Sequence, residues 1–383
     1  MSTNRTLVTA ADDRYMRHRA IPWWDQDRLT NARVLVAGAG AIGNEVIKLL
    51  ALMGVNNLTI VDFDTIEITN LTRSILFRDT DIGNSKSIIA AARARDLNPD
   101  SVAIGIHGDL EYDVGIGVYR NHDLIIGCLD SVNARLALNR CSMRSGTPWI
   151  NGGIEATFGE VTWHTNNSAC FECGMTESMW ERRNRRYSCG GQLANIPTDS
   201  VPTTATIASI IASYLVNEAL LLLHAESFED KAGLKAGEKL FLSLQPYAFH
   251  IAAMETNTSC TAHEKWEPLQ ALNLDVTSST VQDLLSETSG PDGILELGFD
   301  LLTGMHCVQC GETEEMLSPI EKSLLSTTHC DRCNLDTRTP VAISWIDWNS
   351  PLAVRALCEL RIPPLHVISI IADNTRTYFQ LGL

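Results

Sequence analysis

The sequence has no run of about 20 apolar residues free of polar interruptions, the length a helix needs to cross a bilayer. Its longest apolar stretch, residues 204–224, contains Asn217 and Glu218, and we interpret it as a buried core helix. The N-terminal residues lack the basic start and apolar core of a signal peptide. We therefore expect a cytoplasmic protein with no membrane partner.

Positive charge is also scarce. Lys and Arg total 30 against 46 Asp and Glu, which gives a net charge of −16. Binding to nucleic acid needs a basic face, so we expect no nucleic-acid partner. A disulfide framework is absent as well, because the 11 cysteines are an odd number and six of them form three Cys-x-x-Cys pairs. This usage favours zinc and thiol chemistry.

The chain does contain a regular alternation of apolar strands and helices. Strands at 34–37 and 58–61 alternate with helices at 41–53 and 86–96, and "SVAIGIHG" and "DLIIGCL" continue the pattern. Such alternation is typical of a parallel sheet with helical crossovers. We predict the α/β class, with a Rossmann-like domain built on a parallel-centred sheet.

Composition suggests three regions. Residues 1–30 form a polar N-terminal lead-in with helical potential, 31–268 form the main domain, and 290–383 form a small α+β domain with its own cysteines. Within the main domain, 174–203 read as a long crossover loop with few apolar residues and a basic run. A loop of that length in a compact domain usually has a function.

A glycine motif follows the first strand. Gly38, Gly40 and Gly43 form GxGxxG at a strand-to-helix turn, where phosphates can approach the amides of the helix N-terminus. Asp62 ends the second strand, where an acid can hold a ribose. These residues alone fit either an NAD-dependent oxidoreductase or an enzyme that uses ATP.

The residues that follow favour ATP. Asn70, Arg73 and Lys86 suit a triphosphate, and hydride transfer has no need of such a group. Asp130 follows the strand "DLIIGCL", at the sheet edge where a carboxylate could hold Mg²⁺.

These motifs carry a resemblance. From the glycine loop through "VDFDTIEITNLTR", "GNSK" and "CLDSVNAR", the chain resembles the adenylating domain of the ThiF and MoeB enzymes and the ubiquitin-activating enzymes, over residues 10–265. The resemblance implies that Asp62 holds the ribose, that Asn70, Arg73 and Lys86 hold phosphates, and that Asp130 holds magnesium. "RYMRHRAI" resembles the N-terminal arginine motif of the family. Arg17 would then reach the γ-phosphate across a homodimer interface.

Two groups of cysteines have the spacing of zinc ligands. The family commonly has two Cys-x-x-Cys pairs that bind zinc. Here the second pair is Cys-x-x-His, so the resemblance implies a zinc site at Cys170, Cys173, Cys260 and His263. The second group, C-x2-C-x19-C-x2-C, matches a zinc ribbon and consists of Cys307, Cys310, Cys330 and Cys333. We expect two structural Zn²⁺ ions.

Cys189 differs from the remaining cysteines. Arginines before it would lower the pKa of its thiol, and the glycines after it indicate an accessible loop. The region resembles the compact homodimeric enzymes that activate the ubiquitin-fold modifier, which implies that Cys189 accepts the acyl group as a thioester. The larger activating enzymes have a threonine directly after their cysteine, whereas this chain has Gly190 at that position. We expect Cys128, Cys141 and Cys358 to be packed.

The predicted function is ATP-dependent adenylation of the C-terminal carboxylate of a ubiquitin-like protein that ends in glycine. A thioester on Cys189 and transfer to a downstream carrier protein would follow. Three alternatives stay open at this point. They are a ThiF- or MoeB-type enzyme for sulfur transfer or peptide modification without a thioester, an NAD-dependent oxidoreductase, and a binding partner without catalysis.

Overall fold

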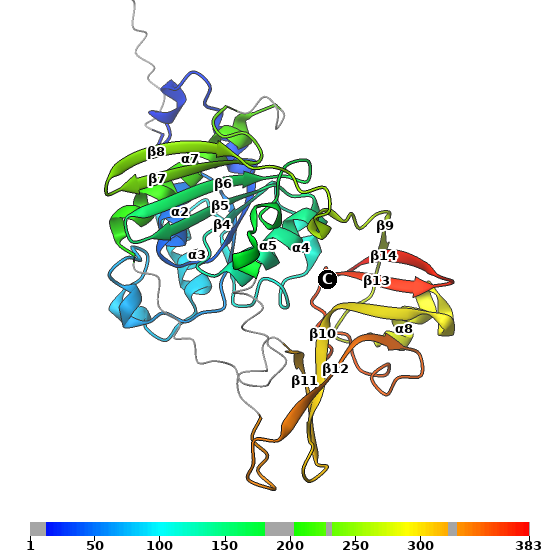
Figure 1. Cartoon of the computed structure of the whole chain (residues 1–383). Helices are drawn as coiled ribbons and strands as arrows, with labels where there is room; N and C mark the ends of the chain where they lie inside the picture. Colours follow the sequence, from blue (N-terminus) through cyan, green and yellow to red (C-terminus); the bar gives the residue numbers. More distant parts are fainter. Residues whose placement is uncertain (1–12, 181–202, 227–231, 321–327, 383) are drawn as a thin grey trace, which may run out of the picture.

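The computed structural model describes residues 13–180, 203–226, 232–320 and 328–382. Most of the predicted crossover loop, with Cys189, lies outside these ranges. The described chain contains two sheets, each with its own hydrophobic core (Figure 1). The predicted α/β fold with a parallel-centred sheet and a smaller second domain is confirmed.

The first sheet has eight strands in the order β3-β2-β1-β4-β5-β6-β7-β8. The five strands from β3 to β5 are parallel, and the three that follow are antiparallel. Their bounds are β1 Arg33–Ala37, β2 Asn57–Val61, β3 Ile104–Ile106, β4 Leu124–Gly127, β5 Trp149–Glu155, β6 Phe158–His164, β7 Glu238–Leu244 and β8 Tyr247–Ala253. The central strands are buried on both faces, which is why they read as continuous apolar runs.

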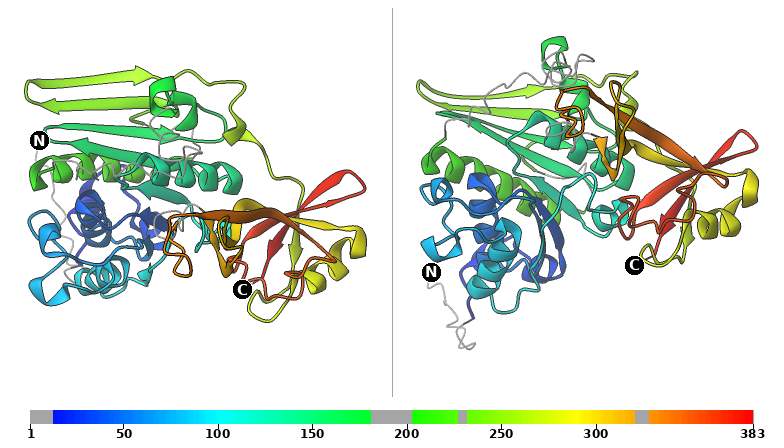
Figure 2. Two further views of the ribbon diagram at one scale, coloured as in Figure 1. Left: turned by 60° about the horizontal axis from the view of Figure 1, so that its bottom comes forward. Right: turned by 90° about the horizontal axis from the view of Figure 1, so that it is seen from below.

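Helices cover both faces of this sheet (Figure 2). Val34 and Val36 of β1 face the core under α2 (Ala41–Leu52), α3 (Lys86–Leu97) and α7 (Ala205–His224), whereas Leu35 and Ala37 face α4 (Ile116–Arg120) and α5 (Val132–Ser145). The short α1, Gln26–Asn31, packs beside α7. Short 3-10 helices occur at His18–Ala20, Ile68–Asn70, Asp79–Asp81, Glu172–Gly174, Thr261–His263 and Gly290–Asp292.

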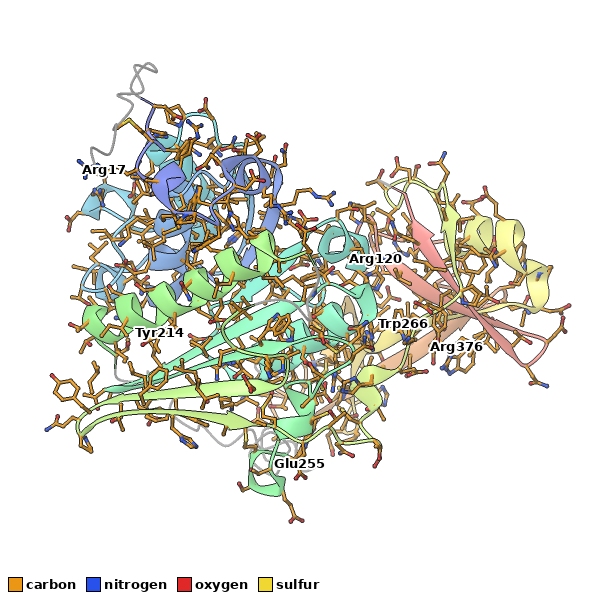
Figure 3. All side chains as sticks on the ribbon, turned by 90° about the horizontal axis from the view of Figure 1, so that it is seen from above. Arg17, Arg120, Tyr214, Glu255, Trp266 and Arg376 are labelled. Carbon is orange, nitrogen blue, oxygen red and sulfur yellow. The ribbon has the colours of Figure 1, made fainter. Side chains whose placement is uncertain are left out.

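Helix α7 is the apolar stretch seen in the sequence, and it lies along the sheet (Figure 3). Glycines let it approach closely, because a Cβ at Gly152 would lie 2.6 Å from a methyl carbon of Leu215 and one at Gly159 would lie 2.4 Å from Ile211. By length and composition α7 could cross a membrane, with mean hydropathy 1.8, but a core helix passes the same test. Its packing against β5 and β6 confirms the predicted core helix.

The second sheet belongs to the C-terminal domain. Its order is β11-β10-β13-β14-β9, and β12 pairs with β10. The bounds are β9 Leu269–Leu272, β10 Ile294–Cys307, β11 Thr313–Pro319, β12 Arg338–Asp347, β13 Val367–Ala372 and β14 Thr375–Leu381, with α8 at Val281–Thr288 packed on the sheet. Residues 269–289, between the two predicted domains, therefore join the second sheet through β9 and α8.

Candidate functional site

A cavity of about 820 Å³ opens where the parallel strands of the first sheet end. Ligands bind at this edge of open α/β sheets because the loops after neighbouring strands meet there. Predicted site residues that line the cavity are Gly38, Gly40, Asp62, Asn70, Arg73, Lys86 and Asp130. We call this cavity the nucleotide cleft.

The glycine loop connects β1 to α2 at the floor of the cleft. Gly38 has a φ of +93°, and a Cβ there would lie 2.6 Å from the carbonyl oxygen of Cys128. Gly43 is not a lining residue. A Cβ on Gly43 would lie 2.0 Å from the carbonyl oxygen of Gly38, so this glycine lets α2 pack against the loop. The N-terminus of α2 therefore reaches the cleft, and Ala41 and Ile42 line it.

Asp62 follows β2 and is held by backbone amides. Its Oδ2 accepts a hydrogen bond from the Ala39 N–H at 2.7 Å, and its Oδ1 accepts one from the Asp64 N–H at 2.8 Å. Burial raises the pKa of this carboxyl group, and the two amide hydrogen bonds oppose that shift. Asp62 thus joins the second strand to the glycine loop.

Lys86 is the first residue of α3, and its side chain is 11% exposed. The Nζ of Lys86 lies 2.7 Å from Oδ2 of Asp64, a cleft residue that the sequence interpretation missed. Asp64 lies two residues after the predicted ribose residue Asp62 in "VDFD", which was the available signal. Because Asp64 is about half exposed, solvent weakens this ion pair.

Two further predicted residues come from the 3-10 helix Ile68–Asn70 and the turn that follows it. The Arg73 guanidinium donates to the carbonyl oxygen of Thr69 at 2.8 Å. Asn70 caps this turn, since its Oδ1 accepts from the Glu67 N–H at 2.9 Å. Both side chains are thereby oriented by their own loop, at the border of the cleft.

On the opposite side, Asp130 lies between β4 and α5 and is exposed. Ser131 caps α5, with its Oγ accepting from the Ala134 N–H at 3.1 Å. Arg135, also missed from the sequence, lines the cleft and donates to the carbonyl oxygen of Leu129 at 2.8 Å. Burial lowers the pKa of the Arg135 guanidinium.

Arg17 lies away from these residues. It is exposed at the N-terminal cap of the first 3-10 helix and does not line the cleft of its own chain (Figure 3). Its predicted role therefore requires a second copy of the chain.

The first cysteine group lies near the end of α5. The Sγ of Cys170 lies 3.7 Å from Sγ of Cys173 and 3.7 Å from Sγ of Cys260, and Sγ of Cys173 lies 3.3 Å from Nε2 of His263. Four ligands at the zinc–sulfur distance would place sulfur atoms about 3.8 Å apart at the corners of a tetrahedron. A disulfide needs about 2.05 Å. This group could hold a metal ion.

The second group lies at the far end of the C-terminal sheet. The Sγ atoms of Cys307 and Cys333 are 3.6 Å apart, as are those of Cys310 and Cys330. All four ligand atoms lie within 4.8 Å of one another, so this group also could hold a metal ion.

The remaining described cysteines divide in two. Cys128 and Cys141 are buried as predicted, and burial raises the pKa of the Cys141 thiol to about 12. The prediction for Cys358 was wrong, because this residue is exposed. Its neighbours Leu357 and Leu360 occupy the core side of a turn segment, which leaves Cys358 facing outward.

Comparison with known proteins adds to this geometry. The SUMO-activating enzyme subunit 2 of Dictyostelium discoideum is 36% identical over 149 residues, which cover 38% of this chain and 22% of that protein. The SAMP-activating enzyme E1 of Haloferax volcanii is 29% identical over 251 residues, 65% of this chain and 87% of that one. The chain thus spans a small part of the first relative and most of the second.

Among solved structures, E. coli MccB crystallised with AMPCPP and MccA has a TM-score of 0.55 at 20% identity. The match covers 67% of this chain and 75% of MccB, and it supports the fold. The model of the ThiF family matches residues 13–262, which contain the eight-stranded sheet and every lining residue of the nucleotide cleft. With well over half of its length matched in this way, the chain belongs to the ThiF family.

Proposed function

We propose that the chain is an ATP-dependent adenylyltransferase that activates the C-terminal carboxylate of a small protein. The observation that carries this proposal is a single cleft lined by the glycine loop, Asp62, Asn70, the cationic side chains of Arg73, Lys86 and Arg135, and the carboxylate of Asp130. The family and the two activating enzymes named above support it.

In the proposed reaction, an oxygen of the substrate carboxylate forms a bond to the α-phosphorus of ATP. The bond from that phosphorus to the bridging oxygen breaks, and pyrophosphate leaves with the electron pair. Asp62 would accept from the ribose hydroxyls, while Arg73 and Lys86 would neutralise charge that develops on the phosphates. Asp130 would hold Mg²⁺, which supplies further neutralisation when bound. This half-reaction needs no protein acid or base.

An NAD-dependent oxidoreductase would use the same glycine loop, but hydride transfer would not need the positive charges of Arg73 and Lys86. We therefore expect ATP with Mg²⁺ to raise the midpoint of thermal unfolding by several degrees. Ligand at 100 times its dissociation constant contributes roughly 3 kcal/mol. NAD at the same concentration should produce no shift. Thermal unfolding followed by fluorescence measures both, and a shift with NAD alone would contradict the proposal.

For the second half-reaction, we propose that the substrate is a ubiquitin-like protein ending in glycine and that Cys189 accepts it. The thiolate would attack the carbonyl carbon of the acyl-adenylate, a thioester would form, and AMP would leave. Cys189 lies outside the described residues, so the support comes from its sequence context and from the activating enzymes among the relatives. A carrier protein would then receive the acyl group.

We also propose a homodimer in which the exposed Arg17 of each copy contributes its guanidinium to the cleft of the other. The two thiol-rich groups, spaced for metal rather than for disulfides, support a cytoplasmic location.

We further propose that both cysteine groups hold zinc, so metal analysis should give two zinc ions per chain. Cys310→Ser and Cys173→Ser should each lower this to one, because three ligands bind zinc far more weakly than four. The exposed Cys358 provides a control, since Cys358→Ser should retain two ions. A zinc content of one or less in the untreated protein would contradict the assignment of two sites.

A further inference from the structure

One wall of the nucleotide cleft is formed by residues 108–112, which we call the wall loop. It follows β3, whereas Asp62 follows β2 and the glycine loop follows β1, and these strands are neighbours in that order. The Gly108 N–H donates to the carbonyl oxygen of Asp62 at 3.4 Å. Because phosphates belong at the glycine loop and ribose at Asp62, the wall loop borders the end of the cleft where the base would lie.

Hydrogen bonds to other residues of the first domain hold the wall loop in place. The buried Tyr119 hydroxyl donates to the carbonyl oxygen of Leu110 at 2.7 Å. The Asp113 N–H donates to the carbonyl oxygen of Asp109 at 3.0 Å, and Oδ2 of Asp113 accepts from the Asp109 N–H at 2.8 Å. These bonds fix the start of the loop and the turn that follows it.

The C-terminal domain contacts the same loop from outside. The rings of Tyr112 and Phe299 lie 5.6 Å apart and nearly perpendicular, at 77°. Phe299 belongs to an irregular stretch of β10, where the pairing with β12 shifts register between Glu296 and Leu301 and Gly298 has a φ of +77°. A bulge of this kind can redirect a side chain out of the regular alternation.

The contact lies next to a close interface between the domains. A Cβ on Gly115 would lie 2.1 Å from the carbonyl oxygen of Pro364, and the Gly117 N–H donates to the carbonyl oxygen of Leu365 at 2.8 Å. Both domains also share one hydrophobic cluster, whose members include Leu110, Val114, Ile116, Val367 and Tyr378. The wall loop is therefore a part of the first domain that contacts a domain outside the matched family region.

We propose that Phe299 is a positioning residue for the nucleotide. Through Tyr112 it holds the wall loop in the conformation that the base end of the cleft requires, so the C-terminal domain is part of the nucleotide site. This inference rests on the proposed use of ATP. Without Phe299 the loop has more freedom, and ATP binding must order it, which weakens affinity.

The test is titration calorimetry of ATP with Mg²⁺ on full-length variants. Phe299→Ala should raise the dissociation constant about three- to tenfold, the range expected for losing an aromatic pair. The maximal rate of pyrophosphate exchange at saturating ATP should stay within about twofold of wild type. Phe299→Tyr should restore wild-type affinity. Trp345→Ala is the matched control, because Trp345 lies opposite Glu296 on β12, is 56% exposed and should leave affinity unchanged.

A double-mutant cycle with Tyr112→Leu separates positioning from general loosening of the domain. If Phe299 acts through Tyr112, adding Phe299→Ala to Tyr112→Leu should cost no further affinity. Additive losses, or wild-type affinity in Phe299→Ala, would overturn the inference. If Phe299→Ala fails to fold, Phe299→Leu carries the same expectations. Wild-type protein that binds no ATP would overturn the proposed function itself, which is a distinct result.

Discussion

Lys86→Ala should lower kcat/KM for ATP–pyrophosphate exchange by about 10²- to 10³-fold, the usual cost of removing one group that stabilises transition-state charge. Lys86 lines the cleft from the first turn of α3, where its ammonium pairs with the half-exposed carboxylate of Asp64. The variant should fold normally, because Asp64 can be solvated when the lysine is removed.

Lys48→Ala serves as the control for Lys86→Ala. Lys48 lies on α2 in the same domain and pairs with Glu45, but it does not line the nucleotide cleft. Exchange in Lys48→Ala should stay within about twofold of wild type, because this half-buried lysine lies outside the cleft. Equal losses in both variants would show that Lys86 acts through stability and not through contact with ATP.

Cys189→Ala should abolish a reductant-sensitive adduct between the protein and its substrate while leaving pyrophosphate exchange within about twofold of wild type. Adenylation needs no thiol, whereas the proposed thioester needs this particular sulfur. The measurement is a non-reducing gel with mass spectrometry, after incubation with ATP, Mg²⁺ and lysate of the source cells.

Cys358→Ala is the matched control for Cys189→Ala, since Cys358 is an exposed thiol in the C-terminal domain. It should keep the adduct. An adduct that persists in Cys189→Ala would remove the proposed role of this residue. Exchange without any adduct in the wild type would favour an enzyme that stops at the adenylate, as in the sulfur-transfer or peptide-modifying alternative.

The sequence predicted those features that follow from local residue patterns and from the order of the parallel strands. Apolar runs identified the buried strands, and the glycine spacing identified the turn before α2. Because parallel strands end at one edge, residues as far apart as Gly38, Asp62 and Asp130 could be expected around one cleft, and all three line it. The spacing of Cys307, Cys310, Cys330 and Cys333 likewise predicted one group that the structure brings together, and the family resemblance implied the other.

Features that depend on three-dimensional packing were not predictable in this way. The spacing of Asp64 and Lys86 does not show that their side chains form an ion pair. In the sequence, Arg135 looks like an ordinary charged residue on the surface of a helix. Cys358 lies in an apolar context, yet it is exposed because its neighbouring leucines occupy the core. The contact of Phe299 with Tyr112 joins two domains across 187 positions in the chain and has no local signal.

In the proposed reaction, this cleft uses ATP to activate a carboxylate. ATP–pyrophosphate exchange tests it most directly, with wild-type protein, Mg²⁺, labelled pyrophosphate and fractions of small proteins from the source cells. We expect label to enter ATP only when a fraction containing the substrate protein is present. Absence of label with every fraction, from protein that is folded and retains its zinc, would contradict it.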